Sequence, residues 1–350
     1  MAVYTTIDNP ELYFQTKLYT GTGTSTAFTL DGDEDMQPDL VWIKRRDSSD
    51  DHEIFDAVRG ANETLNSNTT NAEATVTGSL TSFNSDGFTL GGDFGNVNGS
   101  SNTQVAWCWK AGGSASSNSD GSLTTSVSVN TTAGFSIVGF TLGSGTGSST
   151  QGHGLGAVPH LILHKSRAQA YNWSVYHHKN TAAPETDTLK LNTTAATDDQ
   201  NLVWNDTAPT STVYTHGNNS WNGAGTAISY VWIEKQGFSK FSSFIGNGSS
   251  DGTFVYTGFR PAFLMVKATS ATSAWYIYDN KRAGYNPDNN QLYPDRNNTE
   301  DTTDQVDLLS NGFKWQGITG DPNSSGRTYV YMAFAEAPFV NSNGVPGNAR

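Results

Sequence analysis

The stretch TQVAWCW at residues 103–109 alternates large apolar and smaller side chains, so that Trp107 and Trp109 share one face. This strict period of two predicts a β-strand with one face packed on a core. Two further runs have the same alternation: TAISYVW at 226–232 and TYVYMAF at 328–334. Tyr230 and Met332 stand where Trp107 stands in the first run, so we expect the three strands to bury the same face.

A second motif precedes each alternating run. It is a proline followed by an apolar stretch that ends in lysine, and it occurs three times: PDLVWIK at 38–44, PHLILHK at 159–165 and PAFLMVK at 261–267. Because consecutive positions are apolar, each stretch predicts a central strand that is buried on both faces. Proline is tolerated at the first position of a strand, where a missing N–H donor costs little.

These recurring landmarks divide the chain into three similar units. The expected boundaries are an N-terminal arm at 1–10, unit one at 11–113, a Gly/Ser-rich linker at 114–130, unit two at 131–236, unit three at 237–340 and a C-terminal tail at 341–350. Units of about 100 residues with short strands and Gly/Asn turns are typical of antiparallel β-sandwiches. We therefore expect an all-β chain of three tandem sandwich-like units, of jelly-roll or concanavalin type. The landmarks leave open whether the units lie like beads or close around a pseudo-threefold axis.

Composition and charge exclude several classes of protein. Only 15% of the residues are charged, the net charge is −13, and the basic cluster at 44–46 is followed at once by acidic residues. This balance argues against binding to nucleic acid, which needs a basic surface. The first ten residues have neither a basic nor an apolar segment, so we expect no signal peptide. The longest apolar stretches, such as 262–266, are short, so we expect no membrane insertion. The single Cys108 lies between two tryptophans and is expected to be a buried apolar residue.

One charged pattern repeats with the scaffold. Lys44 and Asp56 have the same spacing as Lys267 and Asp279, and an arginine follows each aspartate by three residues. These groups could stabilise an anionic transition state, but a feature that recurs with the scaffold more often anchors it. We therefore expect Lys44–Asp56 and Lys267–Asp279 to be structural ion pairs between strands.

The sequence contains no pattern that marks a catalytic centre, and we expect no enzymatic activity, no bound metal and no cofactor. The acidic turn DGDED at 31–35 fails the EF-hand pattern because Met36 stands where glycine is required. A calcium site of another kind stays open there. His160 and His164 would lie about 13 Å apart on a strand, which is too far to share one metal.

The segments expected to form loops also contain scattered aromatic residues beside amides and carboxylates. The candidates are Trp173, Trp204, Trp221, Tyr285 and Tyr293. Aromatic faces next to such polar groups are the usual materials of sugar-binding surfaces, whereas the alternative is that these rings belong to the core. We take the five residues as candidate glycan contacts.

Several motifs resemble a known group of proteins. They are GFSKF at 237–241, YTGFRP at 256–261, WYIYD at 275–279, YVYMAFAE at 329–336, WIKRRD at 42–47 and AVRGA at 57–61. They resemble repeated domains of virion proteins from tailed bacteriophages, common in marine phages and often described as tail-fibre or SPRY/concanavalin-like proteins. The second unit departs most from this pattern, because His177 replaces the aspartate.

The resemblance implies a virion structural protein, made in the host cytoplasm. The expected role is a tail-fibre or receptor-binding component that contacts host-surface polysaccharide and other virion proteins as a homo-oligomer on a symmetric particle. The alternative is a capsid decoration or head-fibre protein bound to the major capsid protein. The resemblance supplies no catalytic residue.

Overall fold

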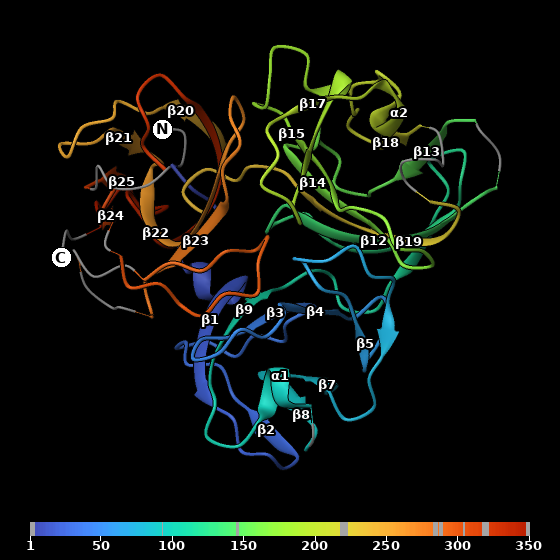
Figure 1. Ribbon diagram of the computed structural model, residues 1–350, viewed down its shortest axis with the longest axis horizontal. Coiled ribbons are helices and arrows are strands. Elements are labelled where there is room, and N and C mark those ends of the chain that lie inside the picture. Colours follow the sequence, from blue (N-terminus) through green and yellow to red (C-terminus); the bar gives the residue numbers. More distant parts are fainter. Residues whose placement is uncertain are drawn as a thin grey trace.

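The computed structural model of the chain describes residues 4–92, 94–144, 147–217, 223–282, 286, 290–303, 305–316 and 322–347. The strands gather in three lobes, and each lobe contains a larger and a smaller antiparallel sheet (Figure 1). The expectation of an all-β chain built from antiparallel sheets is confirmed. The helices within these ranges are short, and none is long and apolar enough to cross a membrane.

The first lobe contains the strands from β1 to β9. Its elements are η1 (Pro10–Leu12), β1 (Phe14–Thr20), β2 (Thr26–Phe28), β3 (Leu40–Arg45), β4 (Glu53–Asp56), β5 (Glu63–Thr64), β6 (Ala74–Thr75), β7 (Leu80–Asn84), β8 (Gly87–Leu90), α1 (Gly95–Asn98) and β9 (Thr103–Trp109). The larger sheet has the order β1-β9-β3-β4, and the smaller sheet has the order β2-β8-β7.

The second lobe contains the strands from β10 to β19. Its elements are β10 (Ser116–Asn118), β11 (Thr125–Asn130), β12 (Phe135–Leu142), β13 (Ser149–Gly152), β14 (Leu161–Ser166), β15 (Ser174–His177), η2 (Pro184–Thr186), β16 (Asp187–Lys190), β17 (Asp198–Asp199), α2 (Asn201–Trp204), β18 (Val213–His216) and β19 (Gly225–Trp232). The larger sheet runs β10-β11-β12-β19-β14-β15-β16-β17, and β13 pairs with β18.

The third lobe contains the strands from β20 to β26. Its elements are β20 (Ser239–Ile245), β21 (Phe254–Tyr256), β22 (Phe259–Ala268), β23 (Trp275–Asp279), β24 (Val306–Leu309), β25 (Gly312–Trp315) and β26 (Thr328–Pro338). The sheets have the orders β20-β26-β22-β23 and β21-β25-β24. In all three lobes, the alternating strand near the end of the lobe lies between an early strand and the proline-led strand.

The alternating strands bury the same face, as their sequences predict. Trp107 lies opposite Trp42, Tyr230 opposite Leu163, and Met332 opposite Met265. All six side chains belong to one hydrophobic cluster that is shared by the three lobes. The lobes therefore surround a common core rather than forming separate beads (Figure 1).

Aromatic rings fill the middle of this shared core. The ring of Trp109 lies 6.4 Å from Trp232 and 5.7 Å from Phe334, which brings together residues from three different lobes. Phe14 stacks on Phe334 with ring centroids 5.3 Å apart. Aromatic rings packed in this way bury large apolar areas. The hydrophobic effect, the dominant favourable contribution to folding, therefore holds the three lobes together.

The proline-led strands are buried on both faces, which confirms the second prediction. In β3, Leu40 and Trp42 face the shared core, whereas Val41 and Ile43 pack in a second cluster between the two sheets of the first lobe. Cys108 belongs to the same second cluster and is buried. Each larger sheet is thus a layer between the shared core and the core of its own lobe.

The expected linker at 114–130 differs from the structure. This segment contains β10 and β11, and β11 pairs with β12 along five residues, from Ser126 opposite Gly139 to Asn130 opposite Phe135. The Gly/Ser-rich composition at 112–122 suggested flexibility, but the apolar residues Val127 and Val129 follow it with period two. Val127 is buried, so this segment extends the second sheet instead of separating two units.

Candidate functional site

The expected ion pairs Lys44–Asp56 and Lys267–Asp279 are wrong. In the antiparallel register, Asp56 lies opposite Leu40 and Asp279 lies opposite Phe263. Each lysine therefore lies four residues further along its strand, about 13 Å away. The two aspartates pair instead with the arginines three residues after them, Arg59 and Arg282.

The buried lysines bind backbone carbonyl groups. Lys44 Nζ donates to the carbonyl oxygens of Arg45 and Ser48, at 2.6 and 3.1 Å. Lys165 and Lys267 likewise donate to carbonyl oxygens of the residues that follow them. Burial lowers the pKa of all three amines to about 8, because removal from water disfavours the charged form.

Asp56 organises a turn at the end of β4. Its Oδ1 accepts hydrogen bonds from the backbone nitrogens of Val58 and Arg59, at 3.0 and 2.8 Å, and its Oδ2 pairs with the Arg59 side chain. Arg59 also donates to the carbonyl oxygen of Ile54, at 2.7 Å. Both side chains of the pair are fully buried. A carboxylate with this many donors holds a turn in one conformation.

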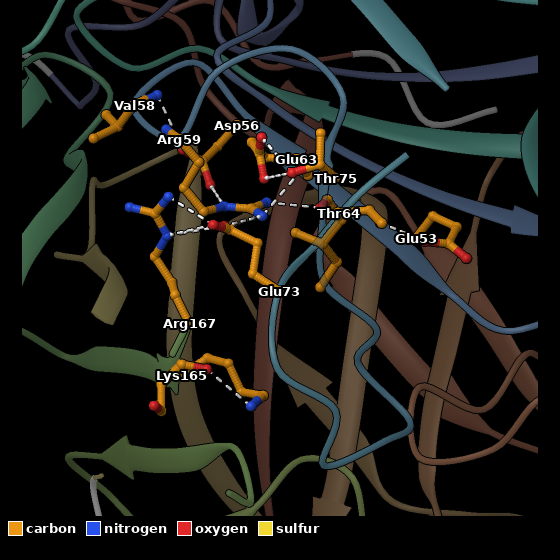
Figure 2. Close-up of polar contacts among 12 residues, drawn as sticks. Glu53, Asp56, Val58, Arg59, Glu63, Thr64, Glu73, Thr75, Lys165 and Arg167 are labelled. Carbon is orange, nitrogen blue, oxygen red and sulfur yellow. Dashed lines mark hydrogen bonds and ion pairs between the residues drawn. The ribbon is translucent and has the colours of Figure 1, made fainter. Parts of the chain in front are cut away.

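The same pair forms the junction between the first and second lobes (Figure 2). Glu73 bridges Arg59 of its own lobe and Arg167 of the second lobe, at 3.1 and 2.7 Å. The hydroxyl of Tyr230, on β19, donates to Asp56 Oδ2 at 2.7 Å. Two arginines and two carboxylates thus neutralise one another across the junction, and the tyrosine satisfies a remaining lone pair.

A corresponding cluster joins the third lobe to the first. Arg282 pairs with Asp279 at 2.6 Å and with Glu300 at 3.2 Å, and Glu300 binds Arg46 of the first lobe at 2.8 Å. The indole nitrogen of Trp107 donates to Asp279 Oδ2 at 3.0 Å. Trp107 and Tyr230 therefore perform the same task at two junctions, although one is an indole and the other a phenol.

The junction between the second and third lobes uses neutral groups. His177 stands where the aspartates stand, and its Nε2 donates to the carbonyl oxygen of Tyr331 at 3.0 Å, while its Nδ1 accepts from the backbone of Lys179 at 3.1 Å. Within the second lobe, the Thr197 hydroxyl donates to Asn180 at 2.6 Å, and the Thr197 backbone nitrogen donates across the junction to the carbonyl oxygen of Thr269 at 2.9 Å. Burial lowers the pKa of His177 to about 3, so this ring is neutral in the folded protein at pH 7.

The electrostatics of the two charged junctions favour stability over reactivity. Burial alone would raise the pKa of Glu300, but hydrogen bonds from Arg46 and the charge of Arg282 lower it below its ordinary value. Burial alone would lower the pKa of Arg59, whereas the charge of Asp56 raises it. These groups keep their charges at pH 7, and their hydrogen-bonding capacity is largely taken up within the clusters.

The candidate glycan contacts fall into three groups. Trp173 and Trp204 are fully buried and therefore cannot form an exposed sugar platform. Tyr293 is half-buried, its hydroxyl donates to Asp301 at 2.7 Å, and Arg296 covers its ring at 5.2 Å. Trp221 and Tyr285 lie outside the described residues. The prediction failed for Trp173 and Trp204 because their segments fold back into the cores.

Trp173 has a structural role instead. It packs in the shared core, and its indole nitrogen donates to the carbonyl oxygen of Asn66 in the first lobe, at 2.8 Å. Trp204 packs against Tyr176 and His216 inside the second lobe. For Trp173 and Trp204, the alternative interpretation therefore holds: their rings are part of the hydrophobic cores.

A surface groove lies beside the junction of the first two lobes. Its volume is about 460 Å³, within the range of about 300–1,000 Å³ that is typical of ligand sites. Val58 and Arg167 line one part of it, and the rest is lined by serines and threonines of β11, β12 and their neighbours together with Leu123, Gly139 and Phe140. A second hollow of about 280 Å³ adjoins it, since Leu123 lines both.

Within the described ranges, no group of three or more His, Cys, Asp and Glu side chains is arranged to hold a metal ion. At the acidic turn, Asp31 is paired with Lys17. The backbone nitrogen of Asp33 donates to Glu11 at 3.1 Å. These contacts tie the turn to the neighbouring strand and helix η1.

Two of the charged residues at the junctions could be recognised from a repeated spacing in the sequence, whereas their glutamate partners could not. Arg59 and Arg282 follow their aspartates at the same spacing, and this repeat marks them as members of one structural motif. Glu73 and Glu300 lie on loops without a shared pattern. Only the folded chain brings them to the arginines.

Comparison with protein families gives one match, to the family described as "Domain of unknown function (DUF7483)", over residues 9–338. The chain belongs to the DUF7483 family. The match spans all three lobes, so the domain of this family corresponds to the closed arrangement of three lobes, which we call the ring of lobes, rather than to one lobe. No curated protein and no solved structure matches the chain.

Proposed function

We propose that the three lobes are copies of one β-sandwich module, arranged around a pseudo-threefold axis. The common strand order of the larger sheets supports this, as do the equivalent positions of Trp107, Tyr230 and Met332. Three backbone hydrogen bonds also recur around the ring with the same length of 2.9 Å: Glu73 to Arg167, Thr197 to Thr269 and Glu300 to Arg46. One chain would thereby imitate a homotrimer.

We infer that the protein is a structural component of a tailed-bacteriophage virion, with host attachment through surface glycans as its task. The observation that carries this proposal is the closed ring of buried polar junctions, which holds three lobes in fixed positions. A rigid platform with threefold character suits a particle built from symmetric subunits. The resemblance of the motifs at 237–241 and 329–336 to phage virion proteins supports the same role.

A structural and attachment role requires polar groups that bind a sugar but no catalytic residues. The charged groups at the junctions bind one another, and the surface groove between the first two lobes offers hydroxyl and guanidinium donors to a sugar. In this proposal, the chain contacts other virion proteins on one side and host polysaccharide on another. Several copies would be present on each particle.

The experiment is adsorption to host cells. Purified protein is incubated with the host before the phage that encodes it is added, and free phage are counted. The proposal expects the protein to bind cells and to reduce phage adsorption, and it expects enzymatic removal of surface polysaccharide to abolish both effects. Absence of binding together with unimpaired infection would refute attachment.

A capsid decoration protein is the second candidate. The pseudo-threefold arrangement favours it, because a single chain with this symmetry matches a threefold position of a capsid lattice. A reconstruction of the intact virion distinguishes the two roles. Density for the ring on the head, in contact with the major capsid protein, would replace the attachment proposal, whereas density on the tail would support it.

A further inference from the structure

Hollows of different volume and place lie beside the two corresponding turns at the charged junctions. In the turn after β4, the backbone nitrogen of Val58 donates to Asp56, and in the turn after β23, that of Lys281 donates to Asp279, both at 3.0 Å. Val58 lines the groove of about 460 Å³, whereas Lys281 lines a hollow of only about 60 Å³. The two hollows also differ in place: the groove beside Val58 is lined by Gly139, Phe140 and Thr141 toward the end of β12, whereas the hollow beside Lys281 is lined by Phe14, Gln15 and Thr16 at the start of β1.

The floor of the open groove is a sheet surface with aligned hydroxyl groups. Ser117 lies opposite Ser126 on β10 and β11, and Thr141 lies opposite Thr226 on β12 and β19. All four residues are exposed. Between these pairs stands Gly139, opposite Ser126; a Cβ there would come within 3.1 Å of Val58. The absence of a side chain lets the turn of the first lobe approach the sheet and form the groove wall.

Among the described residues that line this groove, Arg167 is the one that carries a charge. Its Nε and Nη2 bind Glu73, at 2.7 to 3.0 Å, and its side chain remains 22% exposed. No described residue accepts a hydrogen bond from its Nη1. Figure 2 shows the guanidinium with this nitrogen turned away from Glu73. A carboxylate or sulfate could therefore add to the guanidinium without displacing the ion pair.

We propose that this groove binds an acidic sugar unit of a surface polysaccharide, with its carboxylate or sulfate on Arg167 and its hydroxyl groups on Ser126, Thr141 and Thr226. The inference rests on the proposed glycan attachment and names its ligand class. Glu73 neutralises one edge of the Arg167 guanidinium, so recognition of an anion depends on the Nη1 donor that points away from this pair rather than on an excess of positive charge. The adjoining hollow beside Leu123 gives room for a second unit, as a polymer requires.

The test measures binding of the full chain to an oligomer of galacturonic acid, to chondroitin sulfate and to a neutral maltooligosaccharide, by calorimetry at two salt concentrations. We expect at least one acidic oligomer to bind, with weaker binding at high salt, and the neutral oligomer to bind at least tenfold more weakly. Arg167→Gln should reduce acidic binding at least tenfold. Thr141→Trp, which fills the groove, should do the same without changing the charge.

Arg46→Gln is the matched control, because Arg46 binds Glu300 at the other charged junction with the same two nitrogens. It should destabilise the fold as Arg167→Gln does and leave acidic binding intact. Equal loss in both variants would overturn the inference, as would equal binding of the neutral oligomer or no binding of either acid. If cells still adsorb Arg167→Gln normally, glycan attachment stands and this groove is not its site; if cells adsorb no protein at all, attachment itself fails.

Discussion

Replacing His177 with asparagine tests how the neutral junction between the second and third lobes responds to acid. In the folded protein, His177 Nδ1 accepts from Lys179 while Nε2 donates to Tyr331. A proton on Nδ1 would face the Lys179 N–H and break this hydrogen bond, so the folded protein disfavours the charged form of His177. Asparagine can accept from Lys179 as Asp56 accepts from Val58, but it does not titrate.

The sign and size follow from linkage. The pKa of His177 is lowered to about 3 by burial, from 6.5 in the unfolded chain. Its contribution to stability is therefore complete above pH 6.5 and is lost as the pH falls toward 3, because only the unfolded state gains a proton. Between pH 6.5 and pH 4.5 this amounts to about 2 kcal/mol, because the slope rises from half of its full value at pH 6.5 to about 1.4 kcal/mol for each pH unit.

The assay is urea unfolding followed by tryptophan fluorescence at pH 7.0 and at pH 4.5. At pH 7.0, His177→Asn should be less stable than the wild type by about 1–3 kcal/mol, since the Tyr331 carbonyl loses its donor. At pH 4.5 the difference should vanish or reverse. Other buried histidines titrate in both proteins, so the difference between the two slopes isolates His177. Equal slopes would refute the reasoning.

Three further predictions concern single side chains. Asp279→Asn should cost about 1–3 kcal/mol in urea unfolding because buried Arg282 loses one of its two carboxylate partners and keeps only Glu300, whereas removal of the half-exposed Lys314 charge should cost less than about 1 kcal/mol. Burial raises the pKa of Glu53 to about 7, so the contribution of this group to stability should fall by about 3 kcal/mol as the pH rises from 4.5 to 7; Glu53→Gln should lack that contribution, and the difference between the unfolding free energies of the two proteins between pH 5 and pH 8 measures it. Trp173→Phe should lower stability by about 1–3 kcal/mol in thermal or urea unfolding, through the lost bond to Asn66, and leave cell binding unchanged; reduced binding by folded protein would contradict its burial.

Periodicity carried most of the information about the strands. The alternation at 103–109 and the doubly apolar stretch at 38–44 both predicted the observed burial, because side-chain direction in a strand is a local property. Ion pairing is not local in this sense. The Lys44–Asp56 pair was inferred from spacing alone, and the register of β3 against β4 places the two groups at opposite ends of the hairpin.

The same distinction applies to the candidate site. The aromatic residues were visible in the sequence, but exposure depends on how their segments pack, and Trp173 and Trp204 turned inward. The groove was not predictable, since Val58 and Gly139 belong to different lobes and carry no motif. Their proximity is a consequence of ring closure.

What could be read from the order of residues was the all-β class, the recurrence of two strand motifs and the side of each strand that meets a core, since these depend on neighbours within a few positions. Folding in three dimensions decided the partners of each charge, the packing of the lobes around one core, and the groove between Val58 and the second sheet. Those outcomes depend on residues more than 90 positions apart, such as Glu73 and Arg167, whose contact exists only after the backbone has placed them.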